Sequence, residues 1–252
     1  MKLLAKKIYF KTFGYRFERN FLELFFNLIT PNYFKTILAI LYWKKLDFKL
    51  SEEEANSHKS KAEKIFKNIT INNNNISRIL EFGGSYGINL EPFLEKFTDI
   101  EVISIDTNNS VKRLEKKYEN YEGIIGSDNI LRDIPNLKYD IAFCCSVLDH
   151  IPDEKKVISI IQQLTRIAKK VYLFEPFLEG VCGDVSYFYR IQIEEKYKLK
   201  YKIEDNYKKF SKNSYLWNYD LYLENLNLPF KKNSFKLHKS SLGPFYKCYE
   251  IN

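Results

Sequence analysis

The sequence predicts an α/β fold built on a doubly wound, mostly parallel sheet. Short apolar segments alternate with amphipathic segments of ten or more residues between residues 78 and 175, which is the pattern of parallel strands joined by helices. A glycine-rich elbow follows the first apolar segment, in ILEFGGSYGINL (79–90). Polar residues follow the later apolar segments, and ligands of such sheets bind at the carboxyl ends of the strands. These three observations predict a ligand site at one edge of the sheet.

The predicted elements follow in order along the chain. Residues 1–50 predict two or three helices interrupted at Thr30-Pro31, because proline fits the first turn of a new helix. Residues 51–70 predict a polar helix, and INNNN (71–75) predicts a linker. The less polar face of that helix carries Ala55, His58, Ala62, Ile65, Phe66 and Ile69. On this face His58 is expected to be packed rather than catalytic.

Strands are predicted at 78–82, 101–105, 123–126, 139–145 and 170–175, and helices at 87–97, 108–119, 153–168 and 218–226. Residues 234–251 predict a hairpin about a Ser-Ser-Leu-Gly-Pro turn.

The composition is that of a soluble globular protein, with 45% hydrophobic and 29% charged residues in a chain of 252. The four cysteines lack paired C-x-x-C spacing and the three histidines lie far apart, which predicts free thiols in a reducing compartment and no metal site. Cys144 and Cys145 are adjacent on one predicted strand, so we expect them to pack on opposite faces of the sheet. Basic residues interrupt the first 14 residues, so no secretory signal is expected and the sequence predicts a cytoplasmic protein.

The net charge of +8 is divided unevenly along the chain. Residues 1–50 hold 10 Lys/Arg and 3 Asp/Glu, residues 51–195 hold 18 and 24, and residues 196–252 hold 12 and 5, which gives +7, −6 and +7. This is either a general excess of surface lysine or a sign that both ends face an anionic partner. Residues 1–45 either lie on the inner membrane face as interfacial helices or pack over the main domain as a lid. Their apolar runs are too short to span a bilayer.

The glycine elbow does not match a dinucleotide or phosphate loop. Counting from Gly83, the third and sixth positions hold Ser85 and Ile88 instead of glycine, and no Gly-Lys-Ser/Thr follows. The remaining pattern is acid-x-Gly-x-x-x-Gly-x-Asn, with Glu81 as the acid. A carboxylate here repels a pyrophosphate and suits a ligand that carries an ammonium and a sulfonium. The next strand ends at Asp106, where a carboxylate can accept both hydroxyls of a ribose.

In order and spacing, the elbow, Asp106, SVLDHIPD (146–153) and VYLFEP (171–176) resemble the class I S-adenosylmethionine-dependent methyltransferases over about residues 77–177. The resemblance implies a seven-stranded sheet with an antiparallel last strand, and S-adenosyl-L-methionine as cofactor. We therefore expect a Rossmann-like methyltransferase domain at 71–252 with an acceptor-side insertion at about 180–230, preceded by the helical extension or lid at 1–70.

The resemblance also implies a set of cofactor-binding residues. Glu81, Gly83, Gly84 and Gly87 would hold the methionine part, Asp106 the ribose, and Ser127 or Asp128 the adenine, with Asn89 and Ser146 as further contacts. Many relatives have Gly-Asp at positions 126–127, where this chain has Gly-Ser.

A finer similarity concerns the acceptor. GSDNILRDIPNLKYDIAF (126–143), LDHIPDEK (148–155), WNYDLYL (217–223) and LHKSSLGPFYKCYE (237–250) are similar to methyltransferases of bacterial surface-sugar clusters, including pseudaminic-acid-associated ones. This similarity implies a role in glycan biosynthesis. The predicted reaction is methyl transfer to a hydroxyl or amine of a small molecule or a surface-glycan sugar. Two alternatives stay open, an RNA methyltransferase and an adenosylmethionine-binding protein without catalysis. Because no RNA-binding module is found, nucleic acid is not the expected partner.

His150 and Asp149 are the predicted catalytic residues. An imidazole can take a proton from an acceptor hydroxyl at neutral pH, and His150 follows the fourth strand at the ligand edge. Asp149 either orients that ring or acts in its place. His238, in the terminal hairpin, is a second candidate, and a packed or capping histidine is the alternative for both. The aromatic residues Trp217, Tyr219 and Tyr222, near Tyr187, Phe188, Tyr189 and Arg190, form either a wall for a sugar ring or an ordinary core.

Overall fold

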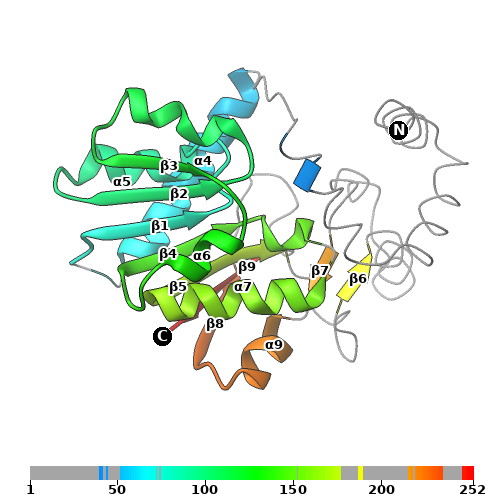
Figure 1. Cartoon of the computed structure of the whole chain (residues 1–252). Coiled ribbons are helices and arrows are strands. Elements are labelled where there is room, and N and C mark those ends of the chain that lie inside the picture. The colour runs from blue at the N-terminus through cyan, green and yellow to red at the C-terminus, as the bar shows by residue number, and fades with distance from the viewer. Residues whose placement is uncertain are drawn as a thin grey trace, which may run out of the picture.

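The computed structural model describes residues 40–41, 44, 52–71, 73, 75–151, 153–176, 187–189, 215–217, 219–234 and 246–252. Within them the strands form a seven-stranded sheet in the order β3-β2-β1-β4-β5-β9-β8 and a separate pair, β6-β7 (Figure 1). Strands β1 to β5 run parallel, β9 is antiparallel to β5, and β8 is antiparallel to β9. The predicted α/β, doubly wound sheet with an antiparallel last strand is therefore confirmed.

The strands are β1 (Arg78–Phe82), β2 (Glu101–Asp106), β3 (Tyr121–Ile125), β4 (Tyr139–Cys145), β5 (Ala168–Pro176), β6 (Tyr187–Tyr189), β7 (Tyr215–Trp217), β8 (Phe230–Ser234) and β9 (Tyr246–Ile251). The helices are α4 (Glu52–Thr70), α5 (Glu91–Lys96), α6 (Asn129–Asp133), α7 (Glu154–Ile167) and α9 (Tyr219–Asn225), with 3-10 turns η1 (Ile88–Leu90), η2 (Asn109–Lys116) and η3 (Leu148–His150).

Most predicted elements are present within a few residues of their expected bounds, and three differ in kind. The predicted helix 87–97 is divided into η1 and α5, with a proline in the first turn of α5. The predicted helix 108–119 is the shorter 3-10 segment η2. In the terminal hairpin the strand β9 is confirmed, but its described hairpin partner is β8, which ends where the predicted hairpin begins. The predicted turn, and His238, lie outside the described residues.

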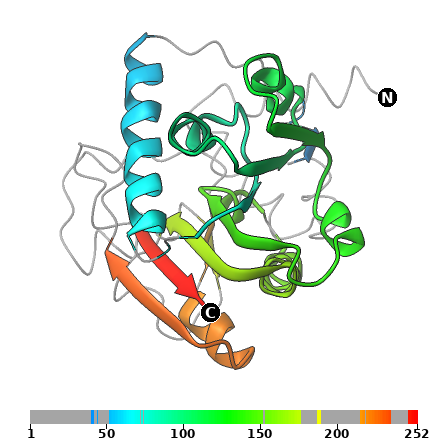
Figure 2. The ribbon, with the colours of Figure 1, turned by 90° about the vertical axis from the view of Figure 1, so that its left-hand side faces the viewer.

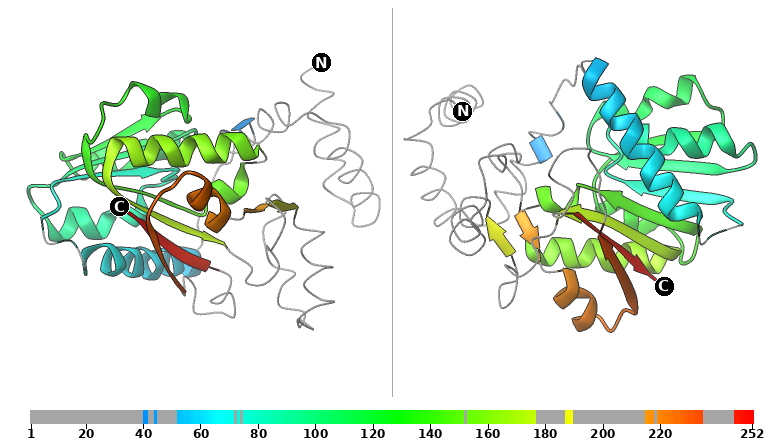
Figure 3. Two further views of the ribbon diagram at one scale, coloured as in Figure 1. Left: turned by 90° about the horizontal axis from the view of Figure 1, so that it is seen from below. Right: turned by 180° about the vertical axis from the view of Figure 1, so that it is seen from behind.

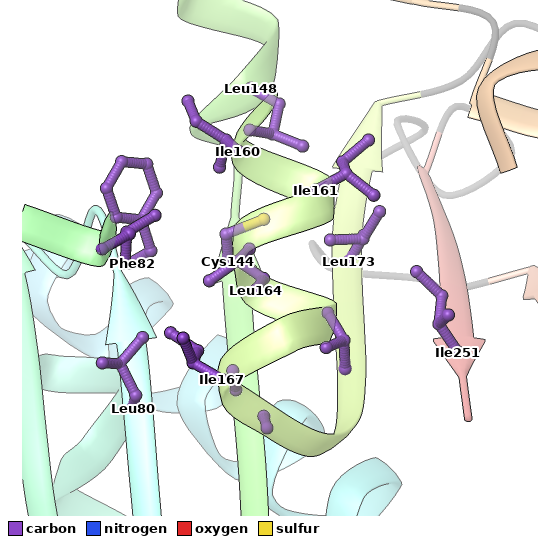
Figure 4. Close-up of a cluster of buried hydrophobic side chains, with 14 of the residues drawn as sticks. Leu80, Phe82, Cys144, Leu148, Ile160, Ile161, Leu164, Ile167, Leu173 and Ile251 are labelled. Atoms are coloured by element: carbon purple, nitrogen blue, oxygen red, sulfur yellow. The ribbon is translucent and has the colours of Figure 1, made fainter. Parts of the chain in front are cut away.

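Alternation along the strands gives the sheet two apolar faces. Leu80 and Cys144 face α7, where they meet Ile160 and Leu164 (Figure 4). Cys145 belongs to the cluster on the opposite face, so the prediction that the adjacent thiols pack on opposite faces is confirmed.

Helix α4 covers part of the second face. It packs on η1 and α5, and it crosses the sheet on the side opposite α7 (Figures 2 and 3). Its buried residues Ile65, Phe66 and Ile69 belong to the core cluster of that face, together with Phe93 of α5. This packing fixes the position of the helix next to the glycine elbow.

Trp217, Tyr219 and Tyr222 are core residues rather than a sugar-binding wall. All three are at most 2% exposed and belong to the α7-side cluster. The indole Nε1 of Trp217 donates a hydrogen bond to the carbonyl of Leu148 at 2.8 Å. The alternative of an aromatic acceptor wall is therefore wrong for these three residues, whereas the side chains of residues 187–190 lie outside the described part of the chain.

The amino ends of the strands are held by Asp140. Its Oδ2 accepts from the backbone N–H groups of Ser77 and Arg78, both at 3.0 Å, and from Ser77 Oγ at 2.8 Å. Its Oδ1 lies 2.7 Å from Lys169 Nζ. Although burial opposes it, the bonds with Lys169, Ser77 and Arg78 hold the pKa of Asp140 well below its ordinary value.

Among the helices that the structure describes, none is long and apolar enough to cross a membrane.

Candidate active site

A cavity of about 300 Å³ lies at the carboxyl ends of β1, β2, β3 and β4. Eight of the predicted site residues line it: Gly83, Gly84, Asn89, Asp106, Ser127, Asp128, Ser146 and His150. Three predicted residues do not line it, namely Glu81, Gly87 and Asp149. Because the parallel strands end at one edge, residues up to 67 positions apart in sequence meet in one cavity, as the order of polar strand ends predicted.

The glycine elbow has almost no room for side chains. Gly83 has φ +80°, and a Cβ there would lie 2.3 Å from Val147 Cγ2. A Cβ on Gly84 would lie 1.9 Å from Ser104 Oγ and 2.6 Å from Glu81 Oε2, so the backbone passes directly over the Glu81 carboxylate. This close approach is why the elbow needs glycine at both positions.

Glu81 lies behind the cavity wall rather than in it. The side chain is fully buried, and Asn89 Nδ2 donates to its Oε1 at 2.6 Å. The other oxygen, Oε2, has no hydrogen-bond partner among the described residues. Burial raises the pKa of Glu81 to about 7, while the bond from Asn89 and the positive charge of Lys61 oppose the rise. With its amide nitrogen committed to Glu81, Asn89 retains its carbonyl oxygen as an acceptor for a ligand donor.

Asp106 is held in place by the loops on both sides of it. Its Oδ2 accepts from the backbone N–H of Ser85 and its Oδ1 from that of Asn108, each at 2.8 Å. Burial raises the pKa of Asp106 above its ordinary value, and these backbone donors oppose the rise. Thr107 also bonds to this carboxylate through its backbone and its side chain, so a ligand hydroxyl would share the oxygens with these protein donors.

The predicted adenine-side residues lie at the end of β3. Asp128 Oδ1 lies 2.8 Å from Lys156 Nζ of α7, and Ser127 Oγ bonds to Asn129 Oδ1 at 2.6 Å. Ser146, at the end of β4, has φ +54° and donates its backbone N–H to the carbonyl of Phe174 at 3.0 Å. The ion pair leaves Asp128 with one carboxylate oxygen for a ligand.

The segment that carries His150 is fixed from below by Glu175, the penultimate residue of β5. This buried carboxylate accepts from the backbone N–H groups of Val147 at 3.1 Å, Leu148 at 3.2 Å and Asp149 at 3.4 Å. Burial and the charge of Asp149 raise the pKa of Glu175 to about 8, although the bonds from Val147 and Leu148 oppose the rise. Glu175 was not among the predicted site residues, although it lies in the motif VYLFEP (171–176).

His150 lines the cavity and Asp149 does not. The His150 Nε2 lies 3.8 Å from Asp149 Oδ1, and the Asp149 side chain is 3% exposed. This separation is longer than a hydrogen bond, and attraction between the two groups requires a protonated ring. The burial of Asp149 argues against the alternative that it acts directly on a substrate.

Two residues of α4 also line the cavity, and neither was predicted to belong to the site. His58, expected to be packed, lies in the cavity wall, and Lys61 follows it by one helical turn. Lys61 lies three residues after His58 and four before Ile65, so these residues share one face of the helix. A lysine on the face that packs against the domain was the signal in the sequence that could have identified Lys61. Within the described part of the chain no His, Cys, Asp and Glu residues group to hold a metal ion.

The comparisons with known proteins agree with this architecture. The methyltransferase domain family matches residues 47–209, more than half of the chain, so the chain belongs to that family. No curated protein matches the sequence.

Solved structures with the same fold include three methyltransferases at low identity. A SAM-dependent methyltransferase from Leishmania major is 11% identical with a TM-score of 0.60, covering 86% of this chain and 82% of its own. The magnesium protoporphyrin IX methyltransferase from Synechocystis PCC 6803, with bound SAH, is 12% identical with a TM-score of 0.51, covering 89% and 98%. A SAM-dependent methyltransferase from Archaeoglobus fulgidus is 16% identical with a TM-score of 0.50, covering 76% and 93%.

The chain is thus an S-adenosylmethionine-dependent methyltransferase. The cavity fits that cofactor: Asp106 offers acceptors for a ribose, and the Glu81 carboxylate behind Gly84 and Asn89 favours a cationic group. The individual contacts of the predicted cofactor residues remain predictions.

Proposed function

We propose that this enzyme methylates a hydroxyl group of a small molecule, and that the acceptor is a sugar of a bacterial surface glycan or its precursor. The observation that carries the choice of a hydroxyl is His150, which lines the cofactor cavity with a buried carboxylate 3.8 Å from its ring nitrogen. An acceptor hydroxyl must lose its proton during transfer, and an imidazole beside a carboxylate can take it.

The cavity residues divide between holding the cofactor and serving the acceptor. Asp106 would accept the ribose hydroxyls, and the elbow with Glu81 and Asn89 would receive the methionine part. When bound, the cofactor supplies an electrophilic methyl group on a sulfonium that leaves readily. The protein then has two tasks, to orient the acceptor oxygen and to accept its proton at His150.

Asp149 and Glu175 support His150. Asp149 stabilises the ring when it becomes positively charged, because a buried carboxylate favours a nearby cation. Glu175 fixes the backbone of η3 through three N–H groups, so the position of His150 does not depend on a flexible loop.

The similarity to surface-sugar methyltransferases supports the acceptor class. Two of its segments contain cavity residues, Ser127 and Asp128 in 126–143 and His150 in 148–155. The segment 217–223 instead supplies core residues. Among them Trp217 donates a hydrogen bond to the carbonyl of Leu148, the first residue of η3, which carries His150.

An acceptor screen tests the proposal. The protein is incubated with methyl-tritiated S-adenosylmethionine and, in separate arms, nucleotide-activated sugars, simple amino sugars and bulk tRNA. Label in a sugar, stable as an O-methyl ether, supports the proposal. Label in tRNA or only on an amine overturns the proposal, and so does cofactor binding with no transfer to any sugar.

The His150→Ala variant tests the base. We expect its turnover with the sugar to fall by about 10²–10⁴ while the affinity for S-adenosylhomocysteine stays unchanged. Lys155→Ala, an exposed change on the neighbouring turn, is the matched control and should turn over as the wild type does. Turnover of His150→Ala within a few-fold of the wild type would remove His150 as the base.

A further inference from the structure

Helix α4 brings a buried lysine to the cofactor cavity. Lys61 is 8% exposed, although lysine is rarely buried without a partner, and it lines the cavity. Among the described residues it forms no hydrogen bond or ion pair. Lys156, the other lysine in the described cavity wall, differs because it pairs with Asp128 at 2.8 Å.

Lys61 lines the cavity together with Cys145, at the end of β4, and Asn89, whose amide bonds to Glu81 near the end of β1. Burial raises the pKa of both Glu81 and Cys145, and the positive charge of Lys61 opposes both rises. Strands β1 and β4 are neighbours in the centre of the sheet. Lys61 therefore shares the cavity with groups from the carboxyl ends of β1 and β4.

The cavity wall holds the Lys61 ammonium, and the Glu81 carboxyl group lies buried behind that wall. No ion pair joins Lys61 to Glu81 in the described structure, and Glu81 Oε2 has no hydrogen-bond partner there. Burying charges without partners is costly, so both groups have unused capacity for a ligand. The complementary ligand is a zwitterion with an ammonium near Glu81 and Asn89 and a carboxylate near Lys61.

We propose that Lys61 binds the carboxylate of the amino-acid portion of the cofactor, so that α4 is part of the cofactor site and selects ligands that carry this carboxylate. The inference rests on the proposed cofactor cavity and deepens it. It also joins part of the predicted extension (1–70) functionally to the domain predicted at 71–252. The rival occupant is an anionic group of the acceptor, which the binding experiment below distinguishes because it contains no acceptor.

The test compares two ligands that differ only at the amino-acid end. S-adenosylhomocysteine carries the ammonium and the carboxylate, whereas 5′-methylthioadenosine has the same adenosine with a methyl group in place of the amino-acid chain. Affinities are measured by calorimetry for the wild type, Lys61→Met and Lys61→Arg. Lys59→Met, an exposed change on the same helix, is the matched control.

We expect Lys61→Met to weaken S-adenosylhomocysteine about 10- to 100-fold, which is the loss of one charge-assisted contact, and to change methylthioadenosine less than about twofold. Lys61→Arg keeps the charge and should recover most of the affinity. Lys59→Met should bind both ligands as the wild type does.

Two results overturn the inference. An equal loss for both ligands means that Lys61 only maintains the shape of the cavity, and unchanged affinity for both means that its charge faces something other than the cofactor. Thermal unfolding of each variant separates a loss of binding from a loss of fold, and Lys61→Gln, which also removes the charge, preserves the comparison if Lys61→Met unfolds. If the wild type itself fails to bind S-adenosylhomocysteine, the cofactor assignment fails and not the role of Lys61 alone.

Discussion

Replacing Asp106 with alanine removes the acceptor expected to bind the ribose. In the structure each carboxylate oxygen already accepts one backbone N–H at 2.8 Å, from Ser85 and from Asn108. Thr107 also bonds to this carboxylate, so ribose hydroxyls would share its oxygens with protein donors. A hydrogen bond to a charged group contributes about 1.5–3 kcal/mol, so two ribose bonds set an upper limit of about 3–6 kcal/mol. Sharing with the backbone and competition from water in the cavity reduce this, and we expect a loss of about 1–3 kcal/mol, or about 5- to 150-fold in Kd.

The assay is calorimetric titration with both S-adenosylhomocysteine and 5′-methylthioadenosine. Both ligands contain the ribose, so Asp106→Ala should weaken the two by a similar factor, in contrast to Lys61→Met. Asp133→Ala, an exposed change at the end of α6, is the control. The variant also leaves two backbone N–H groups without acceptors, so its thermal unfolding must be measured alongside. Unchanged affinity in a folded Asp106→Ala protein would refute the assignment of Asp106 to the ribose.

Four further expectations can be checked directly. Burial raises the pKa of Glu81 from 4.5 to about 7, so between these pH values the folded state holds a proton that the unfolded state has lost. The stability of the protein to urea should therefore fall as pH rises from 4.5 to 7, and Glu81→Gln should flatten this profile. The pKa of Asp140 is lowered, so its contribution to folding stability is present above the ordinary pKa of 3.8 and is lost as pH falls below that value. Asp140→Asn should lower the free energy of unfolding by about 1–2 kcal/mol at pH 7 and reduce this dependence on acid pH. Gly87→Val should lower the melting temperature and weaken S-adenosylhomocysteine binding, because Gly87 has a φ of +72° and a Cβ there would lie 2.8 Å from Leu114 Cδ1. A melting temperature equal to that of the wild type would contradict this. If residues 1–45 dock on anionic lipid, the protein should sediment with anionic vesicles at low salt and be released at high salt, whereas no sedimentation at low salt would exclude docking.

Much of the site could be predicted from the sequence, because its signals are local. Apolar runs of strand length determined β1 to β5, and polar residues after each run marked the carboxyl edge where Asp106, Ser127, Asp128 and His150 meet. A parallel sheet brings these strand ends together whatever the loops between them do.

Gly87 has a packing role that the sequence did not predict. It was expected to help hold the methionine part of the cofactor, but it does not line the cavity, and a Cβ on it would meet Leu114 and Tyr121. The glycine is still required, by its φ of +72° and by packing against η2, a contact between segments about 30 residues apart.

Other features were decided only by the tertiary structure. The helical pattern of residues 51–70 showed which residues share a face, but the packing of α4 across the sheet decided that His58 and Lys61 reach the cavity while Ile65 enters the core. Likewise the position of Glu175 below η3 depends on the pairing of β4 with β5, which brings residues 26 to 28 positions apart into hydrogen-bonding distance. Periodicity determines the faces of an element, whereas the surface that each face meets depends on how distant segments pack, and that information is not local to the sequence.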